Sequence, residues 1–195
     1  MSEERIAKYN LLNQLAEAWG TVIFGGSSDV EIPLGELKQA FALNERIYNR
    51  SFPELSAADA ARLYGDCVAE LCPDTVLVHV GEADVIGFAG KETAFGTSFR
   101  RMIDTIKDKN KGCRIVIVSL KNYENDSAVT RINELLKELA AAENCEFQDI
   151  AEKRTWNPTE SSKTASFLHD LGFDSALHIP RSNYDLVRIL FCYEG

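Results

Sequence analysis

Short β-branched runs alternate along the chain with amphipathic stretches, and this alternation is the strongest constraint on the fold. The strand-like runs span residues 21–24, 46–49, 75–80, 114–120 and 145–150, and the helix-like stretches span 34–43, 56–72, 95–112, 126–144 and 182–193. Parallel neighbours in a sheet need crossover connections, which helices supply. The pattern therefore predicts an α/β fold, a flavodoxin-like three-layer sandwich with a five-stranded parallel sheet in the order 2-1-3-4-5.

The chain length suits one domain, which we expect to span residues 1–195. Residues 1–20 are expected to form an N-terminal helix, because apolar residues recur at helical spacing from Ile6 to Trp19, before Gly20. Residues 151–180 form one long irregular stretch, which we expect to lie over the carboxyl edge of the sheet.

Acidic residues outnumber basic ones by 30 to 21, and the formal net charge is −9. Nucleic acids and anionic membrane surfaces attract clusters of Lys and Arg, so we expect neither as a partner. No apolar run approaches the roughly 18 residues of a membrane span, and the charged N-terminus differs from a signal peptide. These features favour a cytoplasmic protein, and the sequence leaves its oligomeric state open.

The cysteines are scattered along the chain and show no metal-binding or disulfide spacing. We expect a buried free thiol at each of them, namely Cys67, Cys72, Cys113, Cys145 and Cys192. His79 lies within an apolar strand-like run, which predicts a core histidine. Glu54, Glu82 and Asp84 bring carboxylates together without His or Cys, so we expect no metal and no cofactor.

Polar segments follow each predicted strand at its carboxyl end, which is where open α/β sheets bind ligands. The first is Gly25-Gly26-Ser27-Ser28-Asp29, and the others lie in 49–55, 81–85, 119–125 and 172–182. A Gly-Gly-Ser-Ser turn after a strand fits a tight turn, a phosphate cradle or the seat of a nucleophile. The residues by themselves leave these three interpretations open.

Four of these segments together resemble the blocks of the SGNH (GDSL-type) hydrolase superfamily, which comprises esterases and lipases on a flavodoxin-like sheet. That family shows Gly-Asp-Ser after a strand, then an Asn-Arg-Gly block, a Gly-x-Asn-Asp block and a final Asp-x-x-His. The matching stretches here are "IFGGSS" (23–28), "YNRSFPELS" (48–56), "LYGDCVAELCPDTVLVHVGEADV" (63–85) and "FDSALHIPRSNYDLV" (173–187). The resemblance spans roughly residues 20–192.

The resemblance implies a catalytic role for Ser27 as nucleophile, His178 as base and Asp174 as the residue that orients the base. It also implies that the substrate is bound by residues around the nucleophile and in the second and third blocks, namely Gly26, Ser28, Glu54, Ala83 and Asp84.

Several signature positions depart from the family pattern. Gly26 stands in place of the aspartate of the first block, and Ala83 stands in place of the asparagine that donates to the oxyanion. The oxyanion glycine of the second block falls on Glu54, or on Ser51 if the neighbouring glycine is meant. The aspartate three residues before the histidine falls on Ser175, and Asp174 is one residue further away.

We therefore expect a serine ester hydrolase that acts on a small acyl or acetyl ester, with carbohydrate-linked esters as one option. The alternative is a degenerate, non-catalytic domain that keeps the fold and binds a small molecule or a protein partner. A nucleotide or phosphate binder is a third interpretation, against which the missing Walker lysine counts.

Overall fold

The computed structural model describes residues 3–122, 125–151 and 183–191. In chain order the helices and strands are α1 (Glu3–Asn13), β1 (Thr21–Gly25), α2 (Ser27–Val30), α3 (Leu34–Ala40), β2 (Ile47–Asn49), α4 (Ala57–Cys67), η1 (Ala69–Leu71), β3 (Thr75–His79), η2 (Glu82–Asp84), α5 (Glu92–Lys109), β4 (Arg114–Val118), α6 (Ser127–Ala142), β5 (Glu146–Gln148) and α9 (Asn183–Phe191). Most of the segment 151–180, expected to lie over the sheet, falls outside the described residues.

The five strands form one parallel sheet in the order β2-β1-β3-β4-β5, which confirms the predicted topology. Strand β1 pairs with both β2 and β3, so strand order reverses beside it. The register sets Gly25, the last residue of β1, opposite His79, the last residue of β3. The turn that follows β1 therefore begins next to His79.

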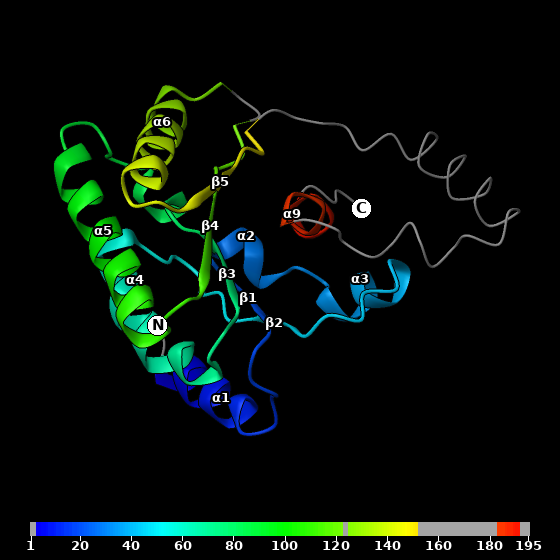
Figure 1. Ribbon diagram of the computed structural model, residues 1–195. Helices are drawn as coiled ribbons and strands as arrows, with labels where there is room; N and C mark the ends of the chain where they lie inside the picture. Colours follow the sequence, from blue (N-terminus) through cyan, green and yellow to red (C-terminus); the bar gives the residue numbers. More distant parts are fainter. Residues whose placement is uncertain (1–2, 123–124, 152–182, 192–195) are drawn as a thin grey trace, which may run out of the picture.

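Alternate residues of the strands pack into two separate cores, one on each face of the sheet. Phe24, Val78 and Ile117 belong to the larger core, which includes buried residues of α4, α5 and α6. Their neighbours Ile23 and Leu77 face a smaller core that includes buried residues of α3 and α9. Figure 1 shows these two helical layers on opposite sides of the sheet. The period-2 alternation of a strand thus explains why both faces are covered.

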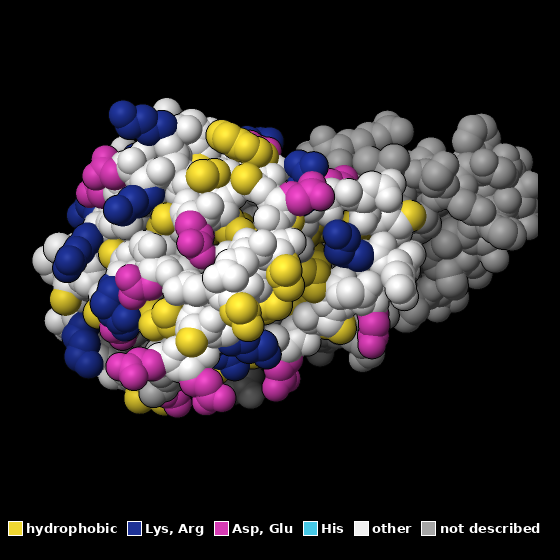
Figure 2. Space-filling view, turned by 90° about the horizontal axis from the view of Figure 1, so that it is seen from below, with side chains coloured by type: hydrophobic (Ala, Val, Ile, Leu, Met, Phe, Trp, Pro, Cys, Tyr) yellow, Lys and Arg dark blue, Asp and Glu magenta, His cyan; other side chains and the backbone are white. Residues whose placement is uncertain are grey.

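Helix α1 ends at Asn13, so the expectation of a helix through residue 20 is wrong. The Asn13 side chain is buried and donates to the Cys67 carbonyl at 2.8 Å and to Glu70 at 2.7 Å, which anchors this end on α4 and η1. Leu15 is 83% exposed and Trp19 is 64% exposed, with a left-handed φ of 65° at Trp19. Figure 2 views the molecule from below Figure 1 and shows apolar side chains among interspersed acidic and basic ones.

Cysteine burial follows the expectation only in part. Cys67 is buried, and desolvation raises the pKa of its thiol to about 11. Cys113 and Cys145 are half-buried, whereas Cys72 is exposed, so the expectation of burial is wrong there. All four are free thiols, and Cys192 lies outside the described residues. Across the described part of the chain, none of the helices is long and apolar enough to cross a membrane.

Candidate active site at the carboxyl ends of the strands

Ser27 is the first residue of α2 and follows β1 after the single residue Gly26. Its side chain is exposed, and its Oγ accepts a hydrogen bond from the backbone N–H of Glu54 at 3.0 Å. The contact joins the turn after β1 to the loop after β2. A serine hydroxyl therefore lies in solvent at the carboxyl edge, beside a backbone donor.

The turn that carries Ser27 is built around the buried carboxylate of Asp29. One carboxylate oxygen accepts the backbone N–H of Gly26 at 2.9 Å, and the Asp29 carbonyl accepts from the Asn49 side chain at 2.7 Å. A Cβ at residue 25 would collide with this carboxylate, so only glycine fits there. Gly25 thus serves the close approach of Asp29 rather than a ligand.

His79 pairs with Asp29 beneath the turn. Its Nδ1 lies 2.8 Å from Asp29 Oδ1 and 2.9 Å from Oδ2, and only 3% of His79 is exposed. The ring also packs edge-on against Phe191 of α9, with centroids 5.1 Å apart. The predicted core position of His79 is confirmed, but its Nε2 is buried with no hydrogen-bond partner in the described part of the chain. The sequence alone could not reveal this pair, because only the register of β1 and β3 brings residues 29 and 79 together.

Glu82 reaches from η2 to the start of α2. Its Oε2 accepts the backbone N–H of Ser28 at 3.2 Å and the Ser28 hydroxyl at 3.1 Å. A Cβ at residue 26 would lie 2.9 Å from the same oxygen. The family pattern has an aspartate where this chain has Gly26. Here the Glu82 carboxylate, which comes from η2, lies next to that position. Glu82 also satisfies an N–H at the helix start, as an anion would.

Glu54 and Ser51 occupy the two positions of the second block that align with glycines. Glu54 is exposed and has a left-handed φ of 56°, a conformation that favours glycine, and this conformation directs its N–H at Ser27. Ser51 is fully buried, and its Oγ accepts the N–H of Gly25 at 3.1 Å. Of the two, Glu54 therefore offers a backbone donor to the Ser27 hydroxyl.

Ala83 and Asp84 lie in η2, after β3. Ala83 is exposed and has no polar side-chain group. The Asp84 carboxylate accepts the backbone N–H of Ala57 at 2.9 Å, and burial raises its pKa above the usual range of an aspartate. Both residues border a cavity of about 230 Å³ that extends toward Phe88 and Phe95.

The partners expected in the last block, His178, Asp174 and Ser175, fall outside the described residues. The structure therefore brings together Ser27, Ser28, Gly26 and Glu54 by direct contacts or chain neighbourhood. It adds Asp29, His79 and Glu82, which sequence reasoning did not assign to the site.

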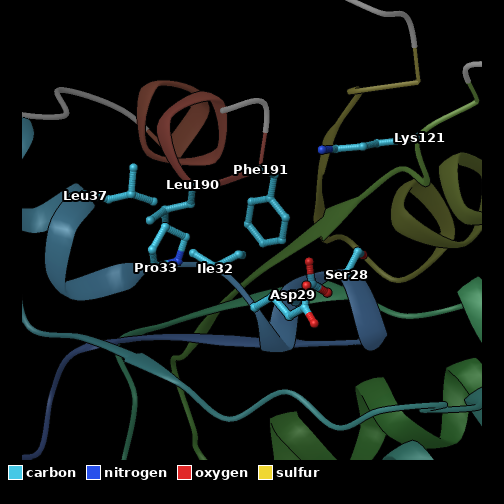
Figure 3. A pocket seen from close by; sticks show the side chains of 9 residues that line it. Ser28, Asp29, Ile32, Pro33, Leu37, Lys121, Leu190 and Phe191 are labelled. Atoms are coloured by element: carbon cyan, nitrogen blue, oxygen red, sulfur yellow. The ribbon is translucent and has the colours of Figure 1, made fainter. Parts of the chain in front are cut away.

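Two further cavities border Ser28 and Lys121. The first, of about 140 Å³, has apolar walls from α3 and α9, including Leu37, Leu190 and Phe191 (Figure 3). The second, of about 170 Å³, is bordered by His79 and Glu82 together with Val85, Leu120 and Val129. In the residues that the structure describes, no cluster of His, Cys, Asp and Glu is arranged to hold a metal ion.

Solved structures with the same fold include several ester hydrolases. An acetyl xylan esterase is 15% identical with a TM-score of 0.60, over 74% of this chain and 84% of that one. A GDSL-like lipase from Bacteroides thetaiotaomicron VPI-5482 is 15% identical with a TM-score of 0.58, over 88% and 98%. A variant of an acetyl-xylooligosaccharide esterase from Geobacillus Stearmophilus is 14% identical with a TM-score of 0.56, over 80% and 96%.

At these identities the structural likeness establishes the fold alone. Among curated proteins, none matches the chain. The sequence model of the GDSL-like Lipase/Acylhydrolase family matches residues 34–179, which is most of the chain and begins after the turn that carries Ser27. The match includes the second and third blocks and extends through His178. With this match, the chain belongs to the GDSL-like lipase/acylhydrolase family.

Proposed function

We propose that the protein is a serine ester hydrolase that acts on small acyl or acetyl esters, with Ser27 as its nucleophile. The observation that carries the proposal is the 3.0 Å contact between Ser27 Oγ and the Glu54 N–H, because it pairs an exposed hydroxyl with a fixed backbone donor. Family membership supports acyl transfer as the chemistry. The acetyl esterases among the structural neighbours support a short acyl group and make carbohydrate-linked esters a substrate class to test.

In the proposed reaction, Ser27 Oγ attacks the carbonyl carbon of the ester while His178 takes the hydroxyl proton and Asp174 orients the imidazole. The Glu54 N–H stabilises the negative charge that develops on the carbonyl oxygen. His178 then gives the proton to the departing alcohol as the C–O bond breaks. Water, activated by the same imidazole, releases the acid from Ser27 and restores the hydroxyl.

The residue at position 83 affects the turnover that we expect. The family position supplies a side-chain amide to the oxyanion, and alanine supplies none. Loss of one such donor lowers turnover by about 10²–10³ in other acyl-transfer enzymes. We therefore expect slow hydrolysis. Gly26, Ser28 and Asp84 are proposed to contact the substrate or to shape its binding site.

Two other functions are alternatives to this proposal: a phosphate-binding site and a non-catalytic binding domain. A phosphate cradle would need free backbone N–H groups at the start of α2, but Gly26 and Ser28 already donate to the carboxylates of Asp29 and Glu82. The second alternative is a non-catalytic binding domain, and the feature that supports it is the missing side-chain amide at Ala83.

The test compares wild-type protein with Ser27→Ala on p-nitrophenyl acetate and on acetylated xylo-oligosaccharides. We expect slow turnover by the wild type and none by the variant, since removal of a nucleophile abolishes nearly all triad catalysis. Thr97→Ala, which removes an exposed hydroxyl on α5, is the matched control. A fluorophosphonate should add to residue 27, as located by peptide mass. Activity that survives in Ser27→Ala, or a label on Ser28, would refute this assignment, and the absence of both activity and labelling would favour the binding domain.

A further inference from the structure

Helix α2, which begins at Ser27, is too short to hold its own position. It spans the four residues Ser27–Val30, and isolated helices shorter than about 12 residues are marginal in water. The position of the Ser27 hydroxyl therefore depends on contacts that join residues 26–29 to other elements.

These contacts differ in burial, and burial decides which of them holds the turn most firmly. The Ser27 side chain and the residue after it bond the loops that follow β2 and β3 in positions exposed to solvent. By contrast, the contacts of the Asp29 carboxylate with Gly26 and His79 are buried, and Asp29 is only 2% exposed. A hydrogen bond to a charged group is stronger than a neutral one, and exclusion of water strengthens it further. The Asp29 carboxylate is therefore the main anchor of the turn.

His79 holds this carboxylate in place. Because a carboxylate only accepts hydrogen bonds, His79 Nδ1 carries the proton and donates it to Asp29, whose oxygens lie 2.8 and 2.9 Å away. The backbone of His79 ends β3, a strand that pairs with both β1 and β4. Its ring packs edge-on against Phe191, which projects from α9 toward the turn (Figure 3). A donor on a central strand, with its ring packed, is a rigid support for the carboxylate.

Asp29 transmits this support to the residue before the nucleophile. One carboxylate oxygen accepts the Gly26 N–H at 2.9 Å, and the Asp29 N–H donates to the Gly26 carbonyl at 3.2 Å. Ser27 and Ser28 are the two residues that this pair of bonds encloses. A shift of the carboxylate would therefore move the backbone of Ser27.

We propose that His79 is a positioning residue for Ser27, which it holds in place through Asp29 without contact to the ester or to the reacting atoms. The role of Ser27 as nucleophile rests on the proposed function. Misplacement of a reacting group by about 1 Å costs about 10²-fold in rate. Loss of the His79 donor should therefore lower kcat and leave KM nearly unchanged, because the pair does not contact the substrate.

Two substitutions of His79 differ in the one hydrogen bond that matters. In His79→Asn the side-chain amide can still donate to Asp29, and in His79→Leu no donor remains. With p-nitrophenyl acetate we expect His79→Leu to lower kcat by roughly 10- to 100-fold and to change KM by less than about 2-fold. His79→Asn should keep kcat within about 3-fold of wild type. An unchanged kcat in His79→Leu, or equal losses in the two variants, would overturn the proposal.

Met102→Ala is the control for lost stability. Met102 is fully buried in the larger core, on α5, so its truncation should destabilise the fold without changing kcat. A loss of kcat in Met102→Ala as large as that in His79→Leu would show that the effect of His79 is one of stability alone.

Hydrogen exchange of the Gly26 amide tests the anchor without catalysis. The Val116 amide in β4 reports opening of the sheet, so the ratio of the two exchange rates isolates opening of the turn. His79→Leu should raise this ratio by roughly 10-fold or more, and His79→Asn should return it toward the wild-type value. Equal ratios in wild type and His79→Leu would overturn the proposal. A wild type that shows these exchange differences but hydrolyses no ester would refute the proposed function and support the role of His79 in the turn.

A second pair of variants applies if His79→Leu does not fold, since a buried carboxylate without its partner is strongly destabilising. The double variant Asp29→Asn/His79→Leu removes the charge together with its partner. Asp29→Asn alone, which keeps His79, is the matched control. The double variant should show a lower kcat and faster Gly26 exchange than this control, and equal values in the two would overturn the proposal.

Discussion

Glu54 combines an unfavourable backbone conformation with a favourable position. Its left-handed φ of 56° disfavours a side chain, yet that conformation brings its N–H to the Ser27 hydroxyl. The donor belongs to the main chain and does not depend on which side chain stands at residue 54. In the proposed reaction, the Glu54 carboxylate would disfavour negative charge on the carbonyl oxygen of the substrate.

A double substitution tests whether these residues limit catalysis. Ala83→Asn supplies the missing amide, and Glu54→Gly removes the charge while keeping the N–H, so the pair should raise the kcat of p-nitrophenyl acetate hydrolysis by about 10-fold or more. The effect should fall mainly on kcat, because these groups act on charge present only near the transition state. Glu54→Gln separates the effect of charge from that of backbone strain. A folded double variant that binds ester analogues without hydrolysing them would favour the non-catalytic alternative.

The family resemblance points to Ser27 in the sequence, but the sequence gives no sign of the side chains that surround its turn in the structure. A strand followed by Gly-Gly-Ser-Ser is visible along the chain, and the family pattern assigns its serine. Asp29 and His79 lie 50 positions apart, and Glu82 reaches Ser28 across 54. These contacts depend on strand register and side-chain direction, which periodicity does not encode.

Among the helices, the start of α4 could be predicted from the sequence, whereas the end of α1 could not. The Ser-x-x-Asp pattern at residue 56 predicts an N-cap, and the Ser56 Oγ accepts the Asp59 N–H at 3.3 Å at the start of α4. In α1 the apolar spacing continues past Asn13, but the helix ends there, where the Asn13 side chain donates to the Cys67 carbonyl and to Glu70. Tertiary contacts can override the helix propensity of a local segment.

Asp84 connects η2 to the first residue of α4, and this connection should depend on pH. Burial raises the folded-state pKa of Asp84 above its unfolded value, so the folded state holds the proton more tightly. The Asp84 contribution to stability is therefore present below about pH 4 and decreases as pH rises through the folded-state pKa. Asp84→Asn keeps an oxygen that accepts from Ala57 and does not titrate.

The free energy of unfolding of Asp84→Asn, relative to wild type, should thus increase as pH rises from about 4 through the folded-state pKa of Asp84 and should then level off. Urea unfolding between pH 4 and pH 8 measures it. Asp104→Asn, at an exposed position on α5, serves as the control for charge removal. A relative stability that decreases as pH rises would contradict the buried-carboxyl interpretation.

Over the whole molecule, two cores share one sheet, so we expect them to unfold together as a single domain. Leu190 of α9 is 2% exposed in the smaller core. Leu190→Ala should lower the free energy of unfolding by about 2–5 kcal/mol through lost burial and the cavity left behind. Ile86→Ala, at a side chain that is 92% exposed, should change it by less than about 0.5 kcal/mol.

Urea titrations followed by far-ultraviolet circular dichroism and by tryptophan fluorescence measure both variants. Coincident transitions are the expected result. Two separate transitions in Leu190→Ala would show that the α9 face unfolds independently of the larger core.

The sheet order could be predicted because it depends on alternation and connection handedness, both of which are properties of the whole chain. The number of strands and their order follow from the segments at 21–24, 46–49, 75–80, 114–120 and 145–150. The two cavities beside Ser28 could not be predicted, because their walls combine residues from several elements whose packing is not a periodic property.

The position of α9 in the chain has a consequence for synthesis. The strand β4 ends at Val118, and α9 begins at Asn183, so 65 positions separate the sheet face from the helix that covers it. At about 5–20 residues per second, a ribosome needs roughly 3–13 seconds to span that distance. During this interval Ile23, Leu77 and Val116 lack the cover of α9, and His79 lacks its contact with Phe191. The nascent chain therefore passes through a stage in which the part of this sheet face that α9 covers is accessible to chaperones or to other unfinished chains.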